Sequence, residues 1–235
     1  MIDDRTDWHT HTDLTDGADP LGAMVAAAEA AGLEAYGVSD HVRRSTTWLP
    51  EYVRAVRAVS SPLRIRCGAE AKILDAAGAL DLPADAPPLD YLLIADHQFP
   101  GTEGPLTPSA VTTLLAEGRM TPAGALDQLV EATCAALLAS PAPPILAHLF
   151  SLLPKCGLDE AEVRGEHLKA LAAACRAAGG AVEVNEKWRC PGLGTVRGLM
   201  DLGVEITAGS DAHRAADVGR WSYVREAAAE LGAAR

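Results

Sequence analysis

Short apolar segments and longer alanine-rich segments alternate along this sequence. A short apolar run that stops at a polar residue is typical of a strand buried in a parallel sheet, and the segments between the runs carry helix caps. The expected strands span residues 7–11, 35–39, 63–69, 90–95, 145–147, 181–184 and 204–208. Right-handed crossovers keep helices outside the sheet, so the pattern predicts a parallel α/β fold. Seven such units can close into a TIM-like (β/α)7 barrel or form an open doubly wound sheet.

The segments between these strands divide into helices and loops. Helices are expected over residues 19–31, 49–60, 108–117, 122–139, 159–178, 195–202 and 222–231. Residues 72–82, with a central Ala77-Gly78 turn, are expected to form a small hairpin. Residues 98–107 are rich in proline and glycine and are expected to form a loop long enough to fold over a site. This loop is a candidate lid.

Composition limits the classes of protein to which the chain can belong. Its 235 residues, 49% of them hydrophobic, suffice for a full core, so we expect a single domain over residues 1–235. A formal net charge of -12 argues against non-specific binding to nucleic acid or to an anionic membrane, because both need a basic face. Five cysteines without a C-x-x-C pair indicate reduced thiols, and the acidic start differs from a signal peptide. We therefore expect a soluble, cytoplasmic protein.

The first expected strand carries two histidines two positions apart. Side chains alternate between the faces of an extended strand, so Asp7, His9 and His11 are expected to line one face. Two imidazoles and a carboxylate suit divalent Zn, Mn or Fe, and a turn through Asp16-Gly17 can bring a further carboxylate to them. By itself the motif is as readily interpreted as a polar strand face or a surface pair. Partners elsewhere in the sequence decide between these interpretations.

Other residues of metal-binding type stand at the ends of the expected strands. Six of the seven histidines do so, whereas His167 lies within an expected helix and is interpreted as solvated or partly packed. A lone strand-end histidine is more often a packed residue, but a single metal site explains all six together, at the edge where α/β enzymes keep their chemistry. Nine ligands imply at least two ions and a bridging carboxylate. The candidates are His9, His11, Asp16, His41, Glu70, His97, His148, Asp211 and His213.

The motifs that contain these residues follow one another in a characteristic order. They are Asp7-Trp8-His9-Thr10-His11 with Asp16-Gly17, Ser39-Asp40-His41, Gly68-Ala69-Glu70, Asp96-His97, Leu146-Ala147-His148 and Gly209-Ser210-Asp211-Ala212-His213. Together they resemble the motifs of the PHP (polymerase and histidinol phosphatase) superfamily. The resemblance implies a distorted seven-stranded (β/α) barrel with a trinuclear centre of Mn, Fe or Zn that acts on phosphate esters. Many relatives carry histidine at the position of Asp16, and the aspartate resembles the branch of small stand-alone phosphoesterases.

The resemblance also implies how the ligands are shared among three ions. The first ion would be held by His9, His11, Glu70 and Asp211. Glu70 would bridge to a second ion, which is also held by His97 and His148. The third would be held by Asp16, His41 and His213. Glu70, Asp211 and His213 are accordingly the predicted catalytic residues.

Basic residues beside the strand ends are candidate substrate ligands. Arg43 follows His41, and Lys187 and Arg189 lie in the loop after the strand at 181–184. Guanidinium and ammonium groups bind phosphate oxygens, although most such residues are solvated surface charges. Arg43 and Arg189 are favoured, because residues 185–192 resemble the loop in which histidinol phosphatase relatives keep substrate contacts.

The sequence thus predicts a metal-dependent phosphoesterase that acts on a small phosphorylated metabolite. Bound metals lower the pKa of water, so a metal-activated hydroxide would attack phosphorus without a protein nucleophile. L-histidinol phosphate, a nucleotide or sugar phosphate, and a phosphodiester, as in nuclease-type activity, are the open substrates. One alternative is an amidohydrolase-like enzyme, which would need a bridging lysine that the strand ends lack. The other is a non-catalytic metal-binding module of a replication assembly.

Overall fold

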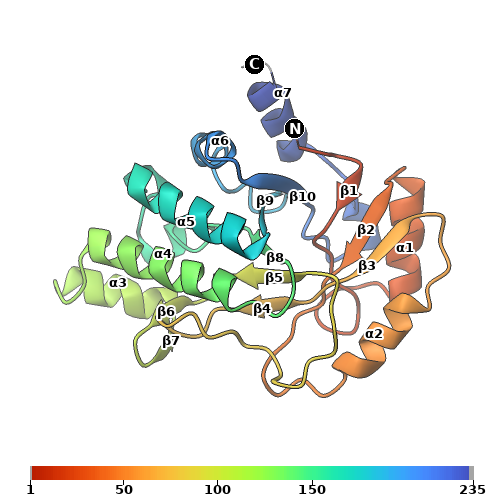
Figure 1. The fold of residues 1–235 in the computed structure, drawn as a ribbon, viewed down its shortest axis with the longest axis horizontal. Helices are drawn as coiled ribbons and strands as arrows, with labels where there is room; N and C mark the ends of the chain where they lie inside the picture. The colour runs from red at the N-terminus through yellow and green to blue at the C-terminus, as the bar shows by residue number, and fades with distance from the viewer. Residues whose placement is uncertain (1, 233–235) are drawn as a thin grey trace.

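The computed structural model describes residues 2–232, and a strand or helix overlaps each expected segment (Figure 1). The strand expected over 7–11 is shorter than predicted, because it covers only Thr6–Asp7 and leaves His9 and His11 in the segment that follows. The strands are β1 (Thr6–Asp7), β2 (Ala35–Val38), β3 (Arg64–Cys67), β4 (Glu70–Lys72), β5 (Leu92–Ala95), β6 (Phe99–Gly101), β7 (Gly104–Leu106), β8 (Pro144–Ala147), β9 (Ala181–Asn185) and β10 (Glu205–Gly209). The helices are α1 (Leu21–Ala30), α2 (Leu49–Arg57), α3 (Pro108–Ala116), α4 (Pro122–Leu138), α5 (Gly165–Ala178), α6 (Leu193–Asp201) and α7 (Tyr223–Gly232).

The main strands form two parallel sheets, and the predicted closed barrel is not confirmed. One sheet has the order β1–β2–β3, and the other has the order β10–β9–β8–β5–β4. One isolated bridge joins Thr10 and Ala212, which follow β1 and β10, and another joins His41, which follows β2, to Glu70 at the start of β4. The predicted continuous sheet is interrupted in two places. β1 pairs over only two residues, and the strand expected over 63–69 ends at Cys67, after which pairing resumes in β4 of the other sheet. The predicted α/β class with parallel strands is confirmed.

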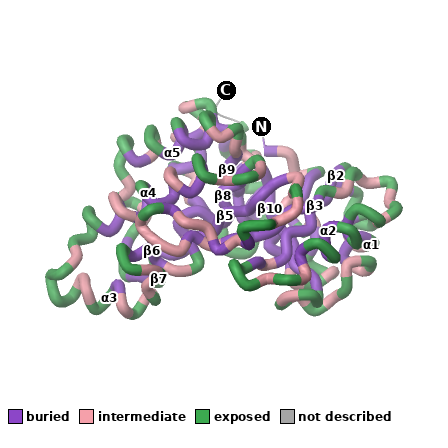
Figure 2. Tube along the Cα trace, turned by 60° about the horizontal axis from the view of Figure 1, so that its bottom comes forward, coloured by how far each residue is buried: buried purple, intermediate pink, exposed green. Residues whose placement is uncertain are grey.

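Helices flank both sheets, and the core lies between the layers. In Figure 1, α1 and α2 lie beside the small sheet, and α4 and α5 lie beside the large one. Strands β2, β5, β8 and β9 are buried along their whole length, and β5 and β8 lie in the purple centre of Figure 2. Parallel strands covered on both faces carry continuous rather than alternating apolar runs. This burial brings the polar residues at the strand ends to one edge of the core.

Local sequence sets most of the helix bounds. Thr121 caps α4, because its side chain accepts a hydrogen bond from the N–H of Gly124 at 3.0 Å. α5 ends at Ala178, and the next residue, Gly179, is its C-cap. The φ of 62° at Gly179 is the left-handed backbone conformation that often follows the last residue of a helix. α5 begins at Gly165 and not at residue 159 as predicted, because residues 160–162 form a separate 3-10 turn.

Residues 98–107, which were expected to form a loop and were a candidate lid, contain an antiparallel hairpin. β6 pairs with β7, and Gly101 lies opposite Gly104 beside the turn. Phe99 is fully buried, and Gln128 of α4 donates a hydrogen bond to the carbonyl of Pro100 at 2.7 Å. The prediction of a loop was therefore wrong for these paired residues, since the two glycines close a tight turn between two short strands.

Two further predictions concern thiols and membranes. All five cysteines are free, and burial raises the pKa of the Cys156 thiol to about 11 and that of Cys67 to about 12. These thiols stay protonated at neutral pH, which makes them poor nucleophiles. Within residues 2–232, no helix combines the length and apolar character that crossing a membrane requires.

Gly68→Ala is expected to destabilise the fold by about 1–3 kcal/mol, the usual cost of overpacking a core. A Cβ atom at Gly68 would overlap Cζ of Tyr91, whose hydroxyl donates a hydrogen bond to the Trp8 carbonyl at 2.8 Å. Urea unfolding measures the change. Gly194→Ala is the matched control, because its added Cβ in α6 would meet no atom within 4 Å apart from its chain neighbours and the backbone of its own helix. Equal stability of the two variants would contradict this packing.

Candidate metal centre

Glu70 lies at the centre of a cluster of side chains at the carboxyl ends of the strands. It begins β4, and only 1% of the residue is exposed. Its Oε1 atom lies 3.0 Å from both His97 Nε2 and His148 Nε2. Its Oε2 atom lies 2.9 Å from His41 Nδ1. Three separate segments of the chain thus direct imidazoles at one buried carboxylate.

His9 and His11 face the same carboxylate from the segment after β1. Their Nε2 atoms lie 3.0 Å apart, and each lies 3.4 Å from Glu70 Oε2. Asp211, just after β10, places Oδ1 4.0 Å from His9 Nε2 and 3.6 Å from His11 Nε2. Asp7 does not join them, because its carboxylate accepts hydrogen bonds from backbone N–H groups, including that of His9 at 3.3 Å.

A second group of side chains adjoins His11 towards the solvent. Asp16 Oδ2 lies 3.4 Å from His41 Nε2 and 3.3 Å from His213 Nε2. The rings of His11 and His41 stack with their centroids 4.3 Å apart. One ligand atom from each of these four residues lies within 4.8 Å of the others. All nine predicted ligands therefore lie in one continuous cluster around Glu70.

The donor atoms of this cluster fit divalent cations. Glu70 Oε2 is buried without a hydrogen-bond partner among residues 2–232, although three ring nitrogens lie within 3.4 Å of it. The facing Nε2 atoms of His9 and His11 present two lone pairs to each other unless a proton or a cation lies between them. A buried polar atom without a partner is costly, and a set of imidazole and carboxylate donors suits Zn, Mn or Fe.

Charges in the cluster depend strongly on one another. Burial alone would raise the pKa of Glu70, but the surrounding histidines, above all His97, hold it well below its usual range. Burial lowers the pKa of His9, but neighbouring carboxylates, including that of Glu70, raise it well above its usual value. Burial holds the pKa of His11 well below its usual value. Protons and metal ions would therefore compete for the same nitrogen atoms.

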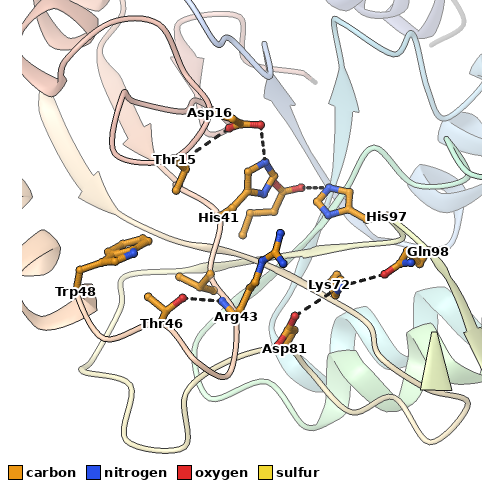
Figure 3. Close-up of a pocket in the computed structure, with 12 residues that line it drawn as sticks. Thr15, Asp16, His41, Arg43, Thr46, Trp48, Lys72, Asp81, His97 and Gln98 are labelled. Carbon is orange, nitrogen blue, oxygen red and sulfur yellow. Dashed lines mark hydrogen bonds and ion pairs between the residues drawn. The ribbon is translucent and has the colours of Figure 1, made fainter. Parts of the chain in front are cut away.

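A pocket of about 670 Å³ opens beside the cluster. Figure 3 shows Asp16, His41 and His97 together at one side of this pocket, with Arg43 and Lys72 on its walls. The guanidinium of Arg43 forms no hydrogen bond or salt bridge to another residue of the described range, 2–232. Lys72 is held in place, because its Nζ atom donates to the side-chain oxygen of Gln98 at 3.0 Å.

The two predicted substrate ligands after β9 point in different directions. Lys187 Nζ lies 3.2 Å from Asp211 Oδ1 and 3.1 Å from His213 Nδ1, so it lies at the cluster. Arg189 instead pairs with Glu226 of α7 at 2.8 Å. The structure therefore brings Arg43 and Lys187 to the site but directs Arg189 away from it.

Two residues at the site had not been predicted to have a functional role. Glu183 Oε1 lies 2.9 Å from His9 Nδ1, and Trp188 donates from Nε1 to Asp211 Oδ2 at 2.9 Å. Glu183 did have a signal in the sequence, because it is the one charged residue of β9, whose other residues are mostly apolar. The orientation of Trp188 had no such signal.

His167 lies outside the cluster, as expected. It is buried in α5, where its Nε2 atom lies 2.8 Å from Asp127 Oδ1 and its Nδ1 atom accepts a hydrogen bond from the N–H of Arg164 at 3.2 Å. Both ring nitrogens are thus used within the helix and its neighbour, so this histidine has a packing role.

Comparisons with known proteins agree with this architecture. Of the solved structures, one that is similar is described as the "putative histidinol phosphatase" HisK from Listeria monocytogenes; it is 18% identical, with a TM-score of 0.64 over 92% of this chain and 97% of that chain. At this identity the similarity shows the fold alone. No curated protein matches the sequence significantly. The family model described as the PHP domain matches residues 7–187, and the chain therefore belongs to the PHP domain family.

Proposed function

We propose that this chain is a metal-dependent phosphatase that hydrolyses phosphate monoesters of small metabolites. The proposal is carried by the convergence of five histidines on the buried carboxylate of Glu70, in a chain of the PHP family. Divalent ions bound there would neutralise charge on a phosphoryl group and lower the pKa of water. The description of the Listeria structure names a reaction of the same class.

The geometry supports a centre with three ions. The two oxygens of Glu70 face different histidines, Oε1 towards His97 and His148 and Oε2 towards His9 and His11, as a bridging carboxylate requires. We assign the first ion to His9, His11, Glu70 and Asp211, and the second to Glu70, His97 and His148. The third is assigned to Asp16, His41 and His213, which gather with His11.

The chain's own residues would bind and orient the substrate in the adjoining pocket. Arg43 supplies a guanidinium without a protein partner, which matches the geometry of phosphate oxygens. The ammonium group of Lys187 forms a salt bridge with the carboxylate of Asp211. We assign Lys187 to substrate binding as well, at the inner side of the cluster. We leave Arg189 out of this assignment, because its side chain forms a salt bridge with Glu226 of α7.

Arg43→Gln is expected to lower kcat/KM for a phosphate monoester by about 10- to 100-fold, mainly through KM. A hydrogen bond to a charged group contributes about 1.5–3 kcal/mol, and 1.4 kcal/mol is a factor of ten in affinity. Steady-state phosphate release measures the effect. Arg44→Gln is the matched control, because Arg44 carries the same charge but donates to the Leu80 carbonyl at 3.3 Å, outside this pocket. An equal loss in both variants would contradict the assignment.

A substrate panel distinguishes this proposal from its alternatives. The metal-loaded protein is offered histidinol phosphate, sugar phosphates, nucleoside monophosphates, a phosphodiester and a cyclic amide. We expect release of inorganic phosphate from at least one monoester and little turnover of the other two classes. Cleavage of the diester alone would favour a nuclease-type activity, and cleavage of the amide alone would favour the amidohydrolase-like alternative.

A further inference from the structure

Glu183 is a carboxylate in the middle of a completely buried strand. All five residues of β9, Ala181–Asn185, are buried, and the exposed fraction of Glu183 is 0%. A carboxylate in such a place is strongly destabilising unless hydrogen bonds or ions compensate for the lost water. The partners of Glu183 therefore indicate why the chain keeps a charge at this position.

Those partners include two of the proposed metal ligands. Oε1 of Glu183 lies 2.9 Å from Nδ1 of His9, and Oε2 accepts a hydrogen bond from the backbone N–H of His148 at 2.6 Å. The amide of Asn185 also donates to Oε2, at 3.1 Å. His9 follows β1 and His148 follows β8, so one carboxylate connects two segments that are distant in the sequence. Neither contact uses the Nε2 atoms that face Glu70.

The surrounding backbone is shaped to admit this carboxylate. Gly209 ends β10, and a Cβ atom there would overlap Glu183 Oε1 and would lie 2.8 Å from Cβ of His9. A side chain at position 209 would therefore displace the carboxylate or the histidine. His148 has a φ of 32°, a conformation that is strained for a residue other than glycine. The hydrogen bond from its N–H to Glu183 stabilises this conformation.

We propose that Glu183 is a positioning residue that orients two of the proposed metal ligands, His9 and His148. As an acceptor for Nδ1–H of His9, it leaves Nε2 of that ring as the metal-binding atom. As an acceptor for the backbone of His148, it fixes the strained turn that directs that ring at Glu70. The inference rests on the proposed metal centre, but it does not depend on which bond the enzyme hydrolyses.

Glu183→Gln tests the proposal with nearly unchanged side-chain volume. We expect the affinity for Zn to fall by about 10- to 100-fold, the usual effect of removing a hydrogen-bond partner of a metal-bound histidine. Competition with a chromogenic chelator measures this affinity. Glu186→Gln is the matched control: Glu186 also lies near the end of β9, but it accepts hydrogen bonds from the N–H groups of Ser222, Tyr223 and Val224 at the start of α7. An affinity equal to that of the control would overturn the proposal.

A second variant keeps the carboxylate and moves it. Gly209→Ala is expected to weaken Zn binding as Glu183→Gln does, whereas a purely structural Glu183 would lower the stability of the metal-free protein and leave the affinity of the folded fraction unchanged. Unfolding of metal-free protein by urea is therefore measured beside the affinity. A folded Gly209→Ala protein with wild-type affinity would overturn the proposal.

The wild-type protein provides a test that needs no variant. In the Zn-loaded protein labelled with ¹⁵N-histidine, we expect His9 to bind through Nε2 with Nδ1 protonated. Metal binding through Nδ1 of His9 would overturn the proposal. Phosphate release is measured separately, so a protein with this ligation but without phosphatase activity would contradict the proposed function and leave the role of Glu183 intact.

Discussion

Glu70→Gln is expected to lower kcat/KM for phosphate release by about 10³-fold or more. Glutamine keeps the volume of the side chain but removes the charge that five ring nitrogens approach within 3.4 Å. Two of the three proposed ions share this carboxylate. Metal ions contribute several kcal/mol to charge stabilisation in a transition state, and 1.36 kcal/mol is a factor of ten in rate. Steady-state assays with the bound metal counted in the same sample measure the loss.

Glu160→Gln is the matched control for this variant. The Glu160 carboxylate accepts hydrogen bonds from the N–H of Gly192 at 2.9 Å and from the hydroxyl of Thr195, where it caps the start of α6. Its replacement is expected to lower stability by about 1 kcal/mol, as the loss of a cap does, and to leave kcat/KM unchanged. Activity of Glu70→Gln within about tenfold of wild type would contradict the assignment of Glu70 as a bridging ligand.

Removal of bound metal by a chelator is expected to lower the Tm by about 5–10 °C. An ion at 100 times its Kd stabilises the folded state by about 2.7 kcal/mol, and 1 kcal/mol corresponds to about 2–4 °C for a chain of this size. The metal-free protein is expected to be less stable because three buried atoms would lose the ion that they share. These atoms are Nε2 of His9, Nε2 of His11 and Oε2 of Glu70. Calorimetry with and without added Mn or Zn measures the shift.

The same titration on Glu70→Gln separates specific from non-specific stabilisation. This variant lacks the carboxylate shared by two proposed ions, so its Tm should respond much less to the chelator than that of the wild type. A wild-type Tm that is insensitive to chelation, or an equal response of both proteins, would show that the ions do not bind at this cluster.

The alternation of strands and helices was predictable because each element carries its own local signal. Apolar runs at β5 and β8 and caps such as Thr121 depend on residues close in sequence. The start of α5 was not predictable in this way. Glu160 has good helix propensity, but it caps α6 instead, so tertiary contacts override the local preference. Barrel closure depends on pairing between distant strand ends, which local patterns do not contain.

The convergence of the proposed metal ligands was predictable, but the contacts that Glu183 and Trp188 make with them were not. Parallel strands place their carboxyl ends at one edge, so polar residues at the ends of several strands meet there whatever the exact register. Glu183 sits in mid-strand, where burial on both faces hides the alternation that would reveal its direction. The direction of Arg189 depends on Glu226, which is 37 residues away. Arg189 was predicted from the resemblance of residues 185–192 to a family loop, and that resemblance contains no information about this salt bridge.

The central claim is that several metal ions at the Glu70 cluster support hydrolysis of a phosphate ester. One preparation tests it directly: metal ions per chain are counted by elemental analysis, and inorganic phosphate release is measured over the monoester panel with the same protein. We expect at least two bound ions per chain, with phosphate release that stops on chelation and returns when metal is added back. Fewer than two ions per chain together with no phosphate release would contradict the claim.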